Sequence, residues 1–246
     1  MLITSFSDMV KLYLGLAQVC GIYSISYLFF YQILSFNKSF ETLPFGKKLY
    51  VVKNVIKSIS LCYLSAITIR YIPSYITMGD IDVNITRWWG SIFVANDLTA
   101  LFLVKNLPSN TRNHHLMTTL LLQVVFLFDG NELEIVKFIV IYTIFSYYAF
   151  LVNLYLGFRF LVLENPEGKK HITLFNDAID KLRILAYYNY GICLLINWTF
   201  HIYYALYQLT RIKLSHIIYF FLLVPIIKDD IILLKWLKYK KNSFNY

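Results

Sequence analysis

Two adjacent histidines, His114 and His115, stand just before the apolar stretch MTTLLLQVVFLF, and Asp97 lies 17 residues ahead of the first of them. Asp97 itself falls within another apolar run, GSIFVANDLTALFLV. A carboxylate beside an imidazole fixes its tautomer and makes it a better proton acceptor, which suits a general base or a nucleophile that takes up an acyl group. These three residues are therefore the candidate catalytic group.

Each of these residues also has a structural interpretation. Asp97 could be a hydrogen-bonded tie between helices, and the histidines could hold lipid headgroups or cap the start of a helix. Adjacent helical residues point about 100° apart, so we expect one imidazole to face the interior and the other to face either the membrane interface or a helix–helix seam. With the histidines opening their helix, Asp97 would lie about two turns deeper. Spacing alone leaves the catalytic and structural interpretations open.

A metal site is a third interpretation, which the sequence does not favour. The remaining histidines, His171, His201 and His216, lie in unrelated contexts without an i, i+4 pair. The three cysteines are scattered over separate apolar runs, so they offer no cluster of ligands. A metal site is therefore the least favoured of the three interpretations, and we expect packed thiols rather than disulfides.

The elements that position these residues follow from composition. Of the 246 residues, 58% are hydrophobic and 15% are charged, against roughly 45–50% and about 25% in soluble domains. Only helices or closed barrels satisfy the backbone in lipid, and the runs lack the alternation of barrel strands. We expect an all-α, multi-pass transmembrane bundle of about seven helices. Its predicted segments are residues 10–36, 49–72, 88–106, 114–128, 135–163, 183–208 and 215–237.

Some boundaries stay open at this stage. The fifth segment is long for one crossing and is expected to break near SYYAFLVN, so six or eight segments remain alternatives. The polar connection ENPEGKKHITLFNDAIDK predicts a loop followed by a short surface helix. Lys228, Asp229 and Asp230 interrupt the last segment and are interpreted as a self-neutralising group. The first segment is expected to be an uncleaved helix.

The formal charge of +9 comes largely from basic residues that flank the apolar runs. This arrangement indicates membrane anchoring rather than nucleic-acid binding. The positive-inside rule then puts the N-terminus in the lumen and the C-terminus in the cytosol, with Arg211 and Lys213 on the opposite side from the other basic loops. The sequon NIT at Asn84 falls in a predicted lumenal loop, where glycosylation is an option.

The stretch VANDLTALFL, a short basic loop and then NHHLMTT resemble the TLC domain, the membrane domain of ceramide synthases and several lipid-linked proteins. The matching positions are Asp97, His114, His115 and Thr118. Further similarity lies in FGKKLYVVKNVIKSIS, FLVNLYLGFRFL and YYNYGICLLINWTF, with Asn54, Ser58, Asn153, Arg159 and Asn189 as the matching polar residues. The resemblance covers residues 45–240, which leaves an N-terminal transmembrane helix and basic loop at 1–44 and a short tail at 241–246.

The resemblance implies six core helices around an intramembrane cavity, usually in the endoplasmic reticulum. Ceramide synthases join a fatty acyl group from acyl-CoA to a sphingoid amine, which implies a histidine that takes the acyl group or a proton and an aspartate that supports it. The chain departs from those enzymes in one respect. They carry a further acidic pair some thirty residues after the histidines, whereas the corresponding stretch here, YTIFSYYAFLVNLY, has no acid.

Two functional classes follow. The first is an acyl-CoA-dependent acyltransferase of the ceramide synthase type, in which Lys105 and Arg112, on a predicted cytosolic loop, receive a CoA phosphate. The second is a non-enzymatic protein that senses, traffics or regulates membrane lipids, which the missing acidic pair favours. A channel or transporter is a distant third, because the intramembrane charges are too few to outline an ion path. Membrane lipids, acyl-CoA and a second copy of the chain are the expected partners.

Overall fold

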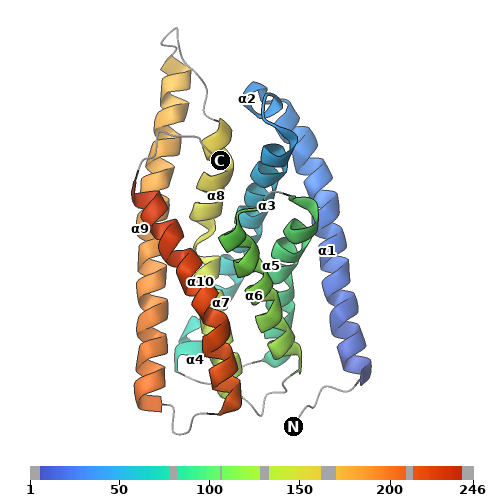
Figure 1. Ribbon diagram of the computed structural model, residues 1–246, viewed down its shortest axis with the longest axis vertical. Coiled ribbons are helices and arrows are strands. Elements are labelled where there is room, and N and C mark those ends of the chain that lie inside the picture. Colours follow the sequence, from blue (N-terminus) through green and yellow to red (C-terminus); the bar gives the residue numbers. More distant parts are fainter. Residues whose placement is uncertain are drawn as a thin grey trace.

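The computed structural model describes residues 6–77, 82–105, 107–127, 133–161, 170–208 and 213–239. These residues form helices and no strand, which confirms the predicted all-α class. Figure 1 shows the long helices side by side, running alternately up and down. The helices are α1 (Phe6–Ser35), α2 (Lys38–Glu41), α3 (Phe45–Thr68), α4 (Ile72–Ile76), α5 (Val83–Leu103), α6 (Ser109–Leu127), α7 (Leu133–Tyr147), α8 (Phe150–Phe158), α9 (Lys170–Tyr203) and α10 (Leu214–Lys238).

Two helical stretches of the described chain are long and apolar enough to cross a membrane, Ser7–Ser35 and Phe45–Ser74. A third is counted if Ile135–Tyr147 and Phe150–Leu161, which meet at a bend of 44°, form one span. Large apolar side chains of α1 and α9 are exposed on the outside, among them Ile25 and Leu195. A surface of this kind is stable in lipid rather than in water. Two or three helices of the described chain could therefore cross a membrane, and the count of seven crossings stays a prediction.

The helices begin earlier than the predicted segments, most clearly α5, α6 and α9. The α6 helix begins at Ser109, five residues before the predicted start, and α5 begins at Val83. Asp82 caps α5, since its carboxylate accepts hydrogen bonds from the backbone N–H groups of Asn84 and Ile85 at 2.9 and 3.1 Å. The predicted short surface helix and the sixth segment form one helix, α9. Apolar runs stop at polar residues, whereas a helix continues through them wherever one face can remain polar.

The predicted break in the fifth segment is confirmed at the junction of α7 and α8. Two side chains from other helices donate hydrogen bonds to carbonyl groups beside it. Ser58 Oγ on α3 donates to the carbonyl oxygen of Phe150 at 3.0 Å, and Asn189 Nδ2 on α9 donates to that of Tyr148 at 2.5 Å. Both donors are polar residues of the TLC resemblance, and the structure places them at the break.

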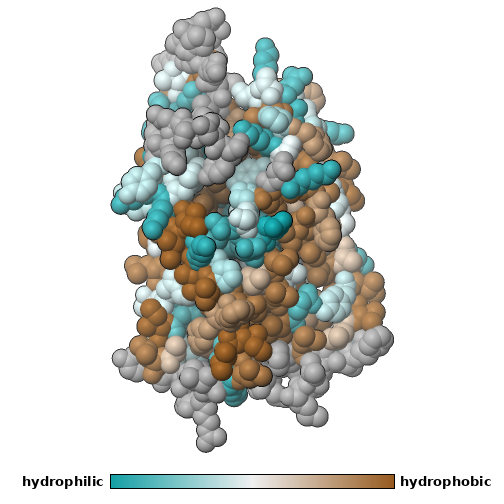
Figure 2. All heavy atoms as spheres, viewed as in Figure 1, coloured by the Kyte–Doolittle hydropathy of each residue, from teal (hydrophilic) through white to brown (hydrophobic). Residues whose placement is uncertain are grey.

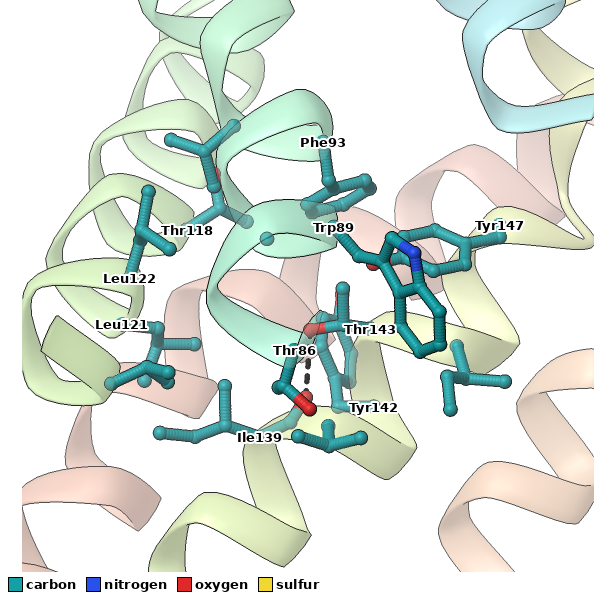
Figure 3. Close-up of a pocket in the computed structure, with 15 residues that line it drawn as sticks. Thr86, Trp89, Phe93, Thr118, Leu121, Leu122, Ile139, Tyr142, Thr143 and Tyr147 are labelled. Carbon is teal, nitrogen blue, oxygen red and sulfur yellow. Dashed lines mark hydrogen bonds between the residues drawn. The ribbon is translucent and has the colours of Figure 1, made fainter. Parts of the chain in front are cut away.

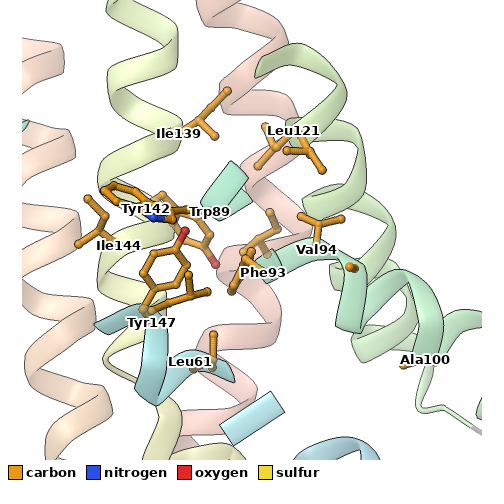
Figure 4. Close-up of a cluster of buried hydrophobic side chains, with 14 of the residues drawn as sticks. Leu61, Trp89, Phe93, Val94, Ala100, Leu121, Ile139, Tyr142, Ile144 and Tyr147 are labelled. Atoms are coloured by element: carbon orange, nitrogen blue, oxygen red, sulfur yellow. The ribbon is translucent and has the colours of Figure 1, made fainter. Parts of the chain in front are cut away.

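Helix α3 lies in the interior and packs against α1, α5, α7 and α8. Its approach to α8 depends on Gly157, because a Cβ there would lie 3.0 Å from Val55 Cγ2 and 3.4 Å from the Val51 carbonyl oxygen. Figure 4 shows the apolar core where α3, α5, α6 and α7 meet, with Leu61, Phe93 and Leu121 among its side chains. Helix α1 packs on α3 and α5, and Tyr23 OH donates to the Ile92 carbonyl oxygen at 3.1 Å.

Several predicted features fall outside the described residues: the loop at 162–169, Arg211, and the tail at 241–246. Asn84 is described and exposed on the first turn of α5.

Replacing Ser58 by Ala should destabilise the protein by about 0.5–1.5 kcal/mol, because the hydrogen bond from α3 to the break is lost. The matched control is Ser24→Ala, since Ser24 Oγ donates within its own helix, to the Cys20 carbonyl oxygen, on the exposed side of α1. Thermal unfolding of the purified protein in detergent, followed by tryptophan fluorescence, measures both variants. Equal melting temperatures for Ser58→Ala and Ser24→Ala would contradict this account of the break.

Candidate functional site

Three helices bring Lys57, Asp97 and His115 together. His115 Nδ1 lies 3.1 Å from Asp97 Oδ1, and Lys57 Nζ donates a hydrogen bond to the same oxygen. The Thr118 hydroxyl donates to the other carboxylate oxygen, Asp97 Oδ2, at 3.5 Å. The site therefore consists of one carboxylate from α5 held by a lysine from α3 and by a histidine and a threonine from α6.

Asp97 and His115 lie at the same depth, so the predicted offset of two turns is wrong. Asp97 is six residues before the end of α5, and His115 is six residues after the start of α6. At 1.5 Å per residue each lies about 9 Å from the connection between the two antiparallel helices. The error came from the start of α6, which was predicted at the histidines instead of at Ser109.

The burial of the cluster makes its charges interdependent. Asp97 is fully buried, and Lys57 and His115 are 7% and 2% exposed. A buried carboxylate without a partner is strongly unfavourable, so the Lys57 ammonium group stabilises Asp97 in place. Asp97 in turn holds His115 through Nδ1. Sequence reasoning missed Lys57, because it was taken as part of a basic helix start. Its position 12 residues into an apolar helix was the available signal.

His114 faces a different neighbour from His115, as the helical geometry predicted. Its Nδ1 lies 3.3 Å from Asp229 Oδ2 on α10. The neighbouring Asp230 accepts a hydrogen bond from Tyr190 OH at 2.6 Å. These contacts overturn the predicted self-neutralising group, since the acids of α10 point into the bundle while Lys228 is exposed. A carboxylate buried at a helix seam takes the donor that the adjoining helix offers rather than the residue beside it in sequence.

A cavity of about 830 Å³ lies beside the cluster, lined by side chains of α3 and α5 to α10. His114, His115 and Lys57 are part of its wall. Its volume falls in the range of small-molecule and cofactor sites, roughly 300–1,000 Å³. His115 Nε2 is buried and has no hydrogen-bond partner in the described part of the chain. His115 Nδ1 forms no hydrogen bond with the described residues either but lies within ion-pair distance of Asp97, so the imidazole lies against the carboxylate in the wall of a cavity large enough for a lipid.

The polar side chains of this region form a patch on an otherwise apolar face. Figure 2 shows the patch near mid-height, where α10 and α6 lie in Figure 1, with apolar side chains below it. Asn54, Asn153 and Arg159, which match polar residues of the TLC resemblance, also line the cavity. The resemblance therefore picked out residues that come from separate helices and meet in one place.

A second, smaller pocket of about 30 Å³ adjoins the site. Figure 3 shows it between α5, α6 and α7, with Trp89, Thr118 and Leu122 in its wall. Phe93 and Tyr142 line both the smaller pocket and the cavity. The space suffices for about one water molecule and its lining is largely apolar. It supplies an apolar wall beneath the cluster rather than a second binding site.

Lys105 and Arg112, predicted to bind a CoA phosphate, are exposed and are not among the residues that line the cavity. Between them, Pro108, Asn110 and Thr111 contribute to its wall. The structure thus brings Asp97, His114 and His115 together and leaves the two basic residues outside. Their role in binding CoA stays a prediction.

A metal ion has a candidate set of ligands here, because one ligand atom each from Asp97, His114 and His115 lies within 4.8 Å of the others. The donor set of one carboxylate and two imidazoles suits a divalent transition metal. Lys57 already donates to Asp97, however, so a bound cation would face a buried ammonium group. The charges fit an acid–base cluster better than a metal centre.

Comparison with known proteins adds no relative: no protein-family model, no curated protein and no solved structure matches the chain. The TLC resemblance therefore depends on the residues quoted above.

Replacing Asp229 by Asn should lower the melting temperature, whereas replacing Lys228 by Gln should leave it unchanged. Only Asp229 contacts another helix, through a partly exposed pair with His114 that contributes up to about 1 kcal/mol. In a chain of this size that corresponds to a shift of about 2–4 °C. Thermal unfolding in detergent measures both variants. An equal shift in melting temperature for Asp229→Asn and Lys228→Gln would contradict this account. It would favour the predicted group in which Lys228 neutralises the neighbouring acids.

Proposed function

We propose that the protein is a membrane acyltransferase in which His115 accepts a proton or an acyl group from a lipid substrate in the cavity. The observation that carries the proposal is the state of His115: Nδ1 is 3.1 Å from Asp97, and Nε2 is unbonded in the described structure and belongs to a residue of the cavity wall. This is the arrangement of a base whose orientation is fixed by a carboxylate.

The proposed reaction moves an acyl group from a thioester to an amine. As the amine nitrogen attacks the carbonyl carbon, its proton passes to His115 Nε2, and Asp97 stabilises the imidazolium that forms. The carbon–sulfur bond then breaks, the carbon–nitrogen bond remains, and the proton passes from His115 to the departing thiolate. Lys57 keeps Asp97 ionised and immobile, so that the imidazole is already oriented when the substrate binds.

The acids of α10 support an amine as the acyl acceptor. The stretch that carries an acidic pair in ceramide synthases has none here, but Asp229 and Asp230 reach the same cavity from α10. Asp229 lies beside His114, on the seam between α6 and α10. A carboxylate at this place would attract an ammonium group and bring it close to the two histidines.

The proposal includes a seven-helix TLC-like bundle in the endoplasmic reticulum, with a lumenal N-terminus and a cytosolic C-terminus. The helix ends support the orientation. The start of α3, the end of α5, the start of α6 and the end of α10 lie at the same end of the molecule in Figure 1. The basic segments that the positive-inside rule assigns to the cytosol adjoin these ends.

A non-enzymatic lipid-binding or lipid-sensing protein is the second candidate. The observation that favours it is the pair of Lys57 and Asp97, which joins α3 to α5 and would stabilise the bundle in a protein without chemistry. The cavity would then hold a lipid without altering it. The two candidates differ in what they require of His115 Nε2.

The test compares cells that express the wild type, His115→Ala or His201→Gln at matched levels, using labelled fatty acid and quantitative lipid profiling. His201 is a buried histidine of α9 that bonds Tyr219 OH at 2.7 Å and does not line the cavity, so it controls for the loss of a buried imidazole. The wild type and His201→Gln should form a new acylated lipid. His115→Ala should form it roughly 10²–10⁴ times more slowly, the usual contribution of a general base.

An unchanged rate of product formation in His115→Ala would refute the catalytic role of His115. A lipid profile that the wild type and His115→Ala shift equally would favour the second candidate.

A further inference from the structure

Three cations of the cavity wall form no ion pair within the described part of the chain. Lys47, Lys53 and Arg159 all line the cavity, and none of them forms an ion pair or a hydrogen bond with the described residues. Lys53 is only 3% exposed, and Arg159 Nε is buried without an acceptor. A buried cation is normally paired, so these side chains are set for an anion that is not part of the described chain.

The carboxylates of this region form their ion pairs and hydrogen bonds with other groups, and Asp97 and Asp229 attract the Lys53 ammonium group only from beyond ion-pair distance. Asp97 accepts from Lys57, Asp229 faces His114, and Asp230 accepts from Tyr190. With the pair of Lys57 and Asp97 set aside, the wall carries three cations, Lys47, Lys53 and Arg159, against the two carboxylates of α10, so a net positive charge remains.

Aromatic rings hold the three cations in one group. Lys53 Nζ and Arg159 Cζ each lie 5.7 Å from the centre of the Tyr50 ring. The Phe160 ring packs against Tyr50 at 5.9 Å, and Lys47 Nζ lies 5.6 Å from its centre. Arg159 Cζ also lies 4.4 Å from the Trp236 ring. Cation–π contacts of this kind orient a guanidinium or ammonium group and leave its N–H donors available.

We propose that Lys47, Lys53 and Arg159, the basic cluster, bind the phosphate group of an amphiphilic ligand whose remainder occupies the cavity. Three cations that converge from two helices suit an anion with several oxygens, and arginine and lysine are the usual phosphate-binding residues. The inference rests on the proposed function only in that both place the ligand in the same cavity. It assigns the phosphate to the basic cluster instead of to Lys105 and Arg112.

The position of the cluster relative to His115 sets the shape of the ligand. Lys53 is four residues and Lys47 ten residues before Lys57 on α3, so the cluster extends from about 6 to about 15 Å along the helix from the level of Asp97. One ligand can therefore place its phosphate on the basic cluster and its reactive carbonyl group at His115. A phospholipid headgroup and a soluble phosphate ester such as CoA share this chemistry.

The test uses the full chain purified in detergent and two pairs of probes. The first pair is dioleoyl phosphatidic acid and dioleoylglycerol, which differ only in the phosphate. The second is coenzyme A and pantetheine, which lacks the phosphates. The variants are Arg159→Gln, Lys53→Met, the charge-conserving Arg159→Lys and, as a control, Lys38→Gln at an exposed position of α2. Equilibrium dissociation constants are measured for each variant.

The wild type should bind the phosphate-bearing member of one pair at least about tenfold more tightly than its partner. Arg159→Gln and Lys53→Met should lose that preference, Lys38→Gln should keep it, and Arg159→Lys should regain part of it. Preference within the first pair identifies a lipid phosphate, and preference within the second identifies a soluble ester. Arg159→Gln decides the outcome if Lys53→Met does not fold, because Arg159 is only half-buried.

The proposal is overturned if the phosphate adds nothing to binding in either pair, or if Arg159→Gln binds as the wild type does. His115→Ala should keep full affinity for the phosphate. Loss of product in His115→Ala and loss of phosphate binding in Arg159→Gln are thus separate results, and either proposal can fail without the other.

Discussion

The fully buried carboxylate of Asp97 is the constraint on which the site depends. It lies between helices that the sequence separates, and each of its two oxygens has a partner on another helix: Lys57 on one and Thr118 on the other. Because the free energy of burying this charge is high, α3, α5 and α6 must meet where these partners converge. The same packing brings His115 against the carboxylate. The orientation of the imidazole is therefore a consequence of the contacts that stabilise the buried Asp97.

The cavity lies next to this cluster and shares residues with it. Lys57 and His115 belong to its wall, which also carries the acids of α10 and the basic cluster. The break between α7 and α8 gives the chain an irregular section beside the cavity, and Ser58 and Asn189 donate hydrogen bonds to its carbonyl groups. Irregular backbone at this depth is stable only where the surrounding protein supplies such donors. The break and the cavity are therefore supported by the same central helix, α3.

Much of this could be read from the sequence. The apolar runs located most of the helices and the break, and Asp97, His114 and His115 stood out because ionisable groups are rare in such runs. The partners of these residues could not be read in the same way. Lys57 and Asp229 are distant in sequence, and which helices pack together depends on shape as well as on polarity, as the contact of Gly157 with Val55 illustrates. The prediction of the relative depth of Asp97 and His115 was wrong for a local reason. Polar residues at 109–113 extend α6 beyond its apolar run.

The most direct measurement of the central claim is a double-mutant cycle between Lys57 and Asp97, in which the free energy of unfolding is obtained by denaturant titration of the detergent-solubilised protein. Lys57→Met and Asp97→Asn should each cost roughly 3–5 kcal/mol, because each removes the partner of a buried polar group. The double variant should cost well below the sum of the two, with a coupling of at least about 2 kcal/mol. The exposed pair of Asp8 and Lys11, 3.2 Å apart, serves as the reference and should couple by under about 1 kcal/mol. Additive effects at Lys57 and Asp97 would contradict the account, since the carboxylate would then not depend on the lysine.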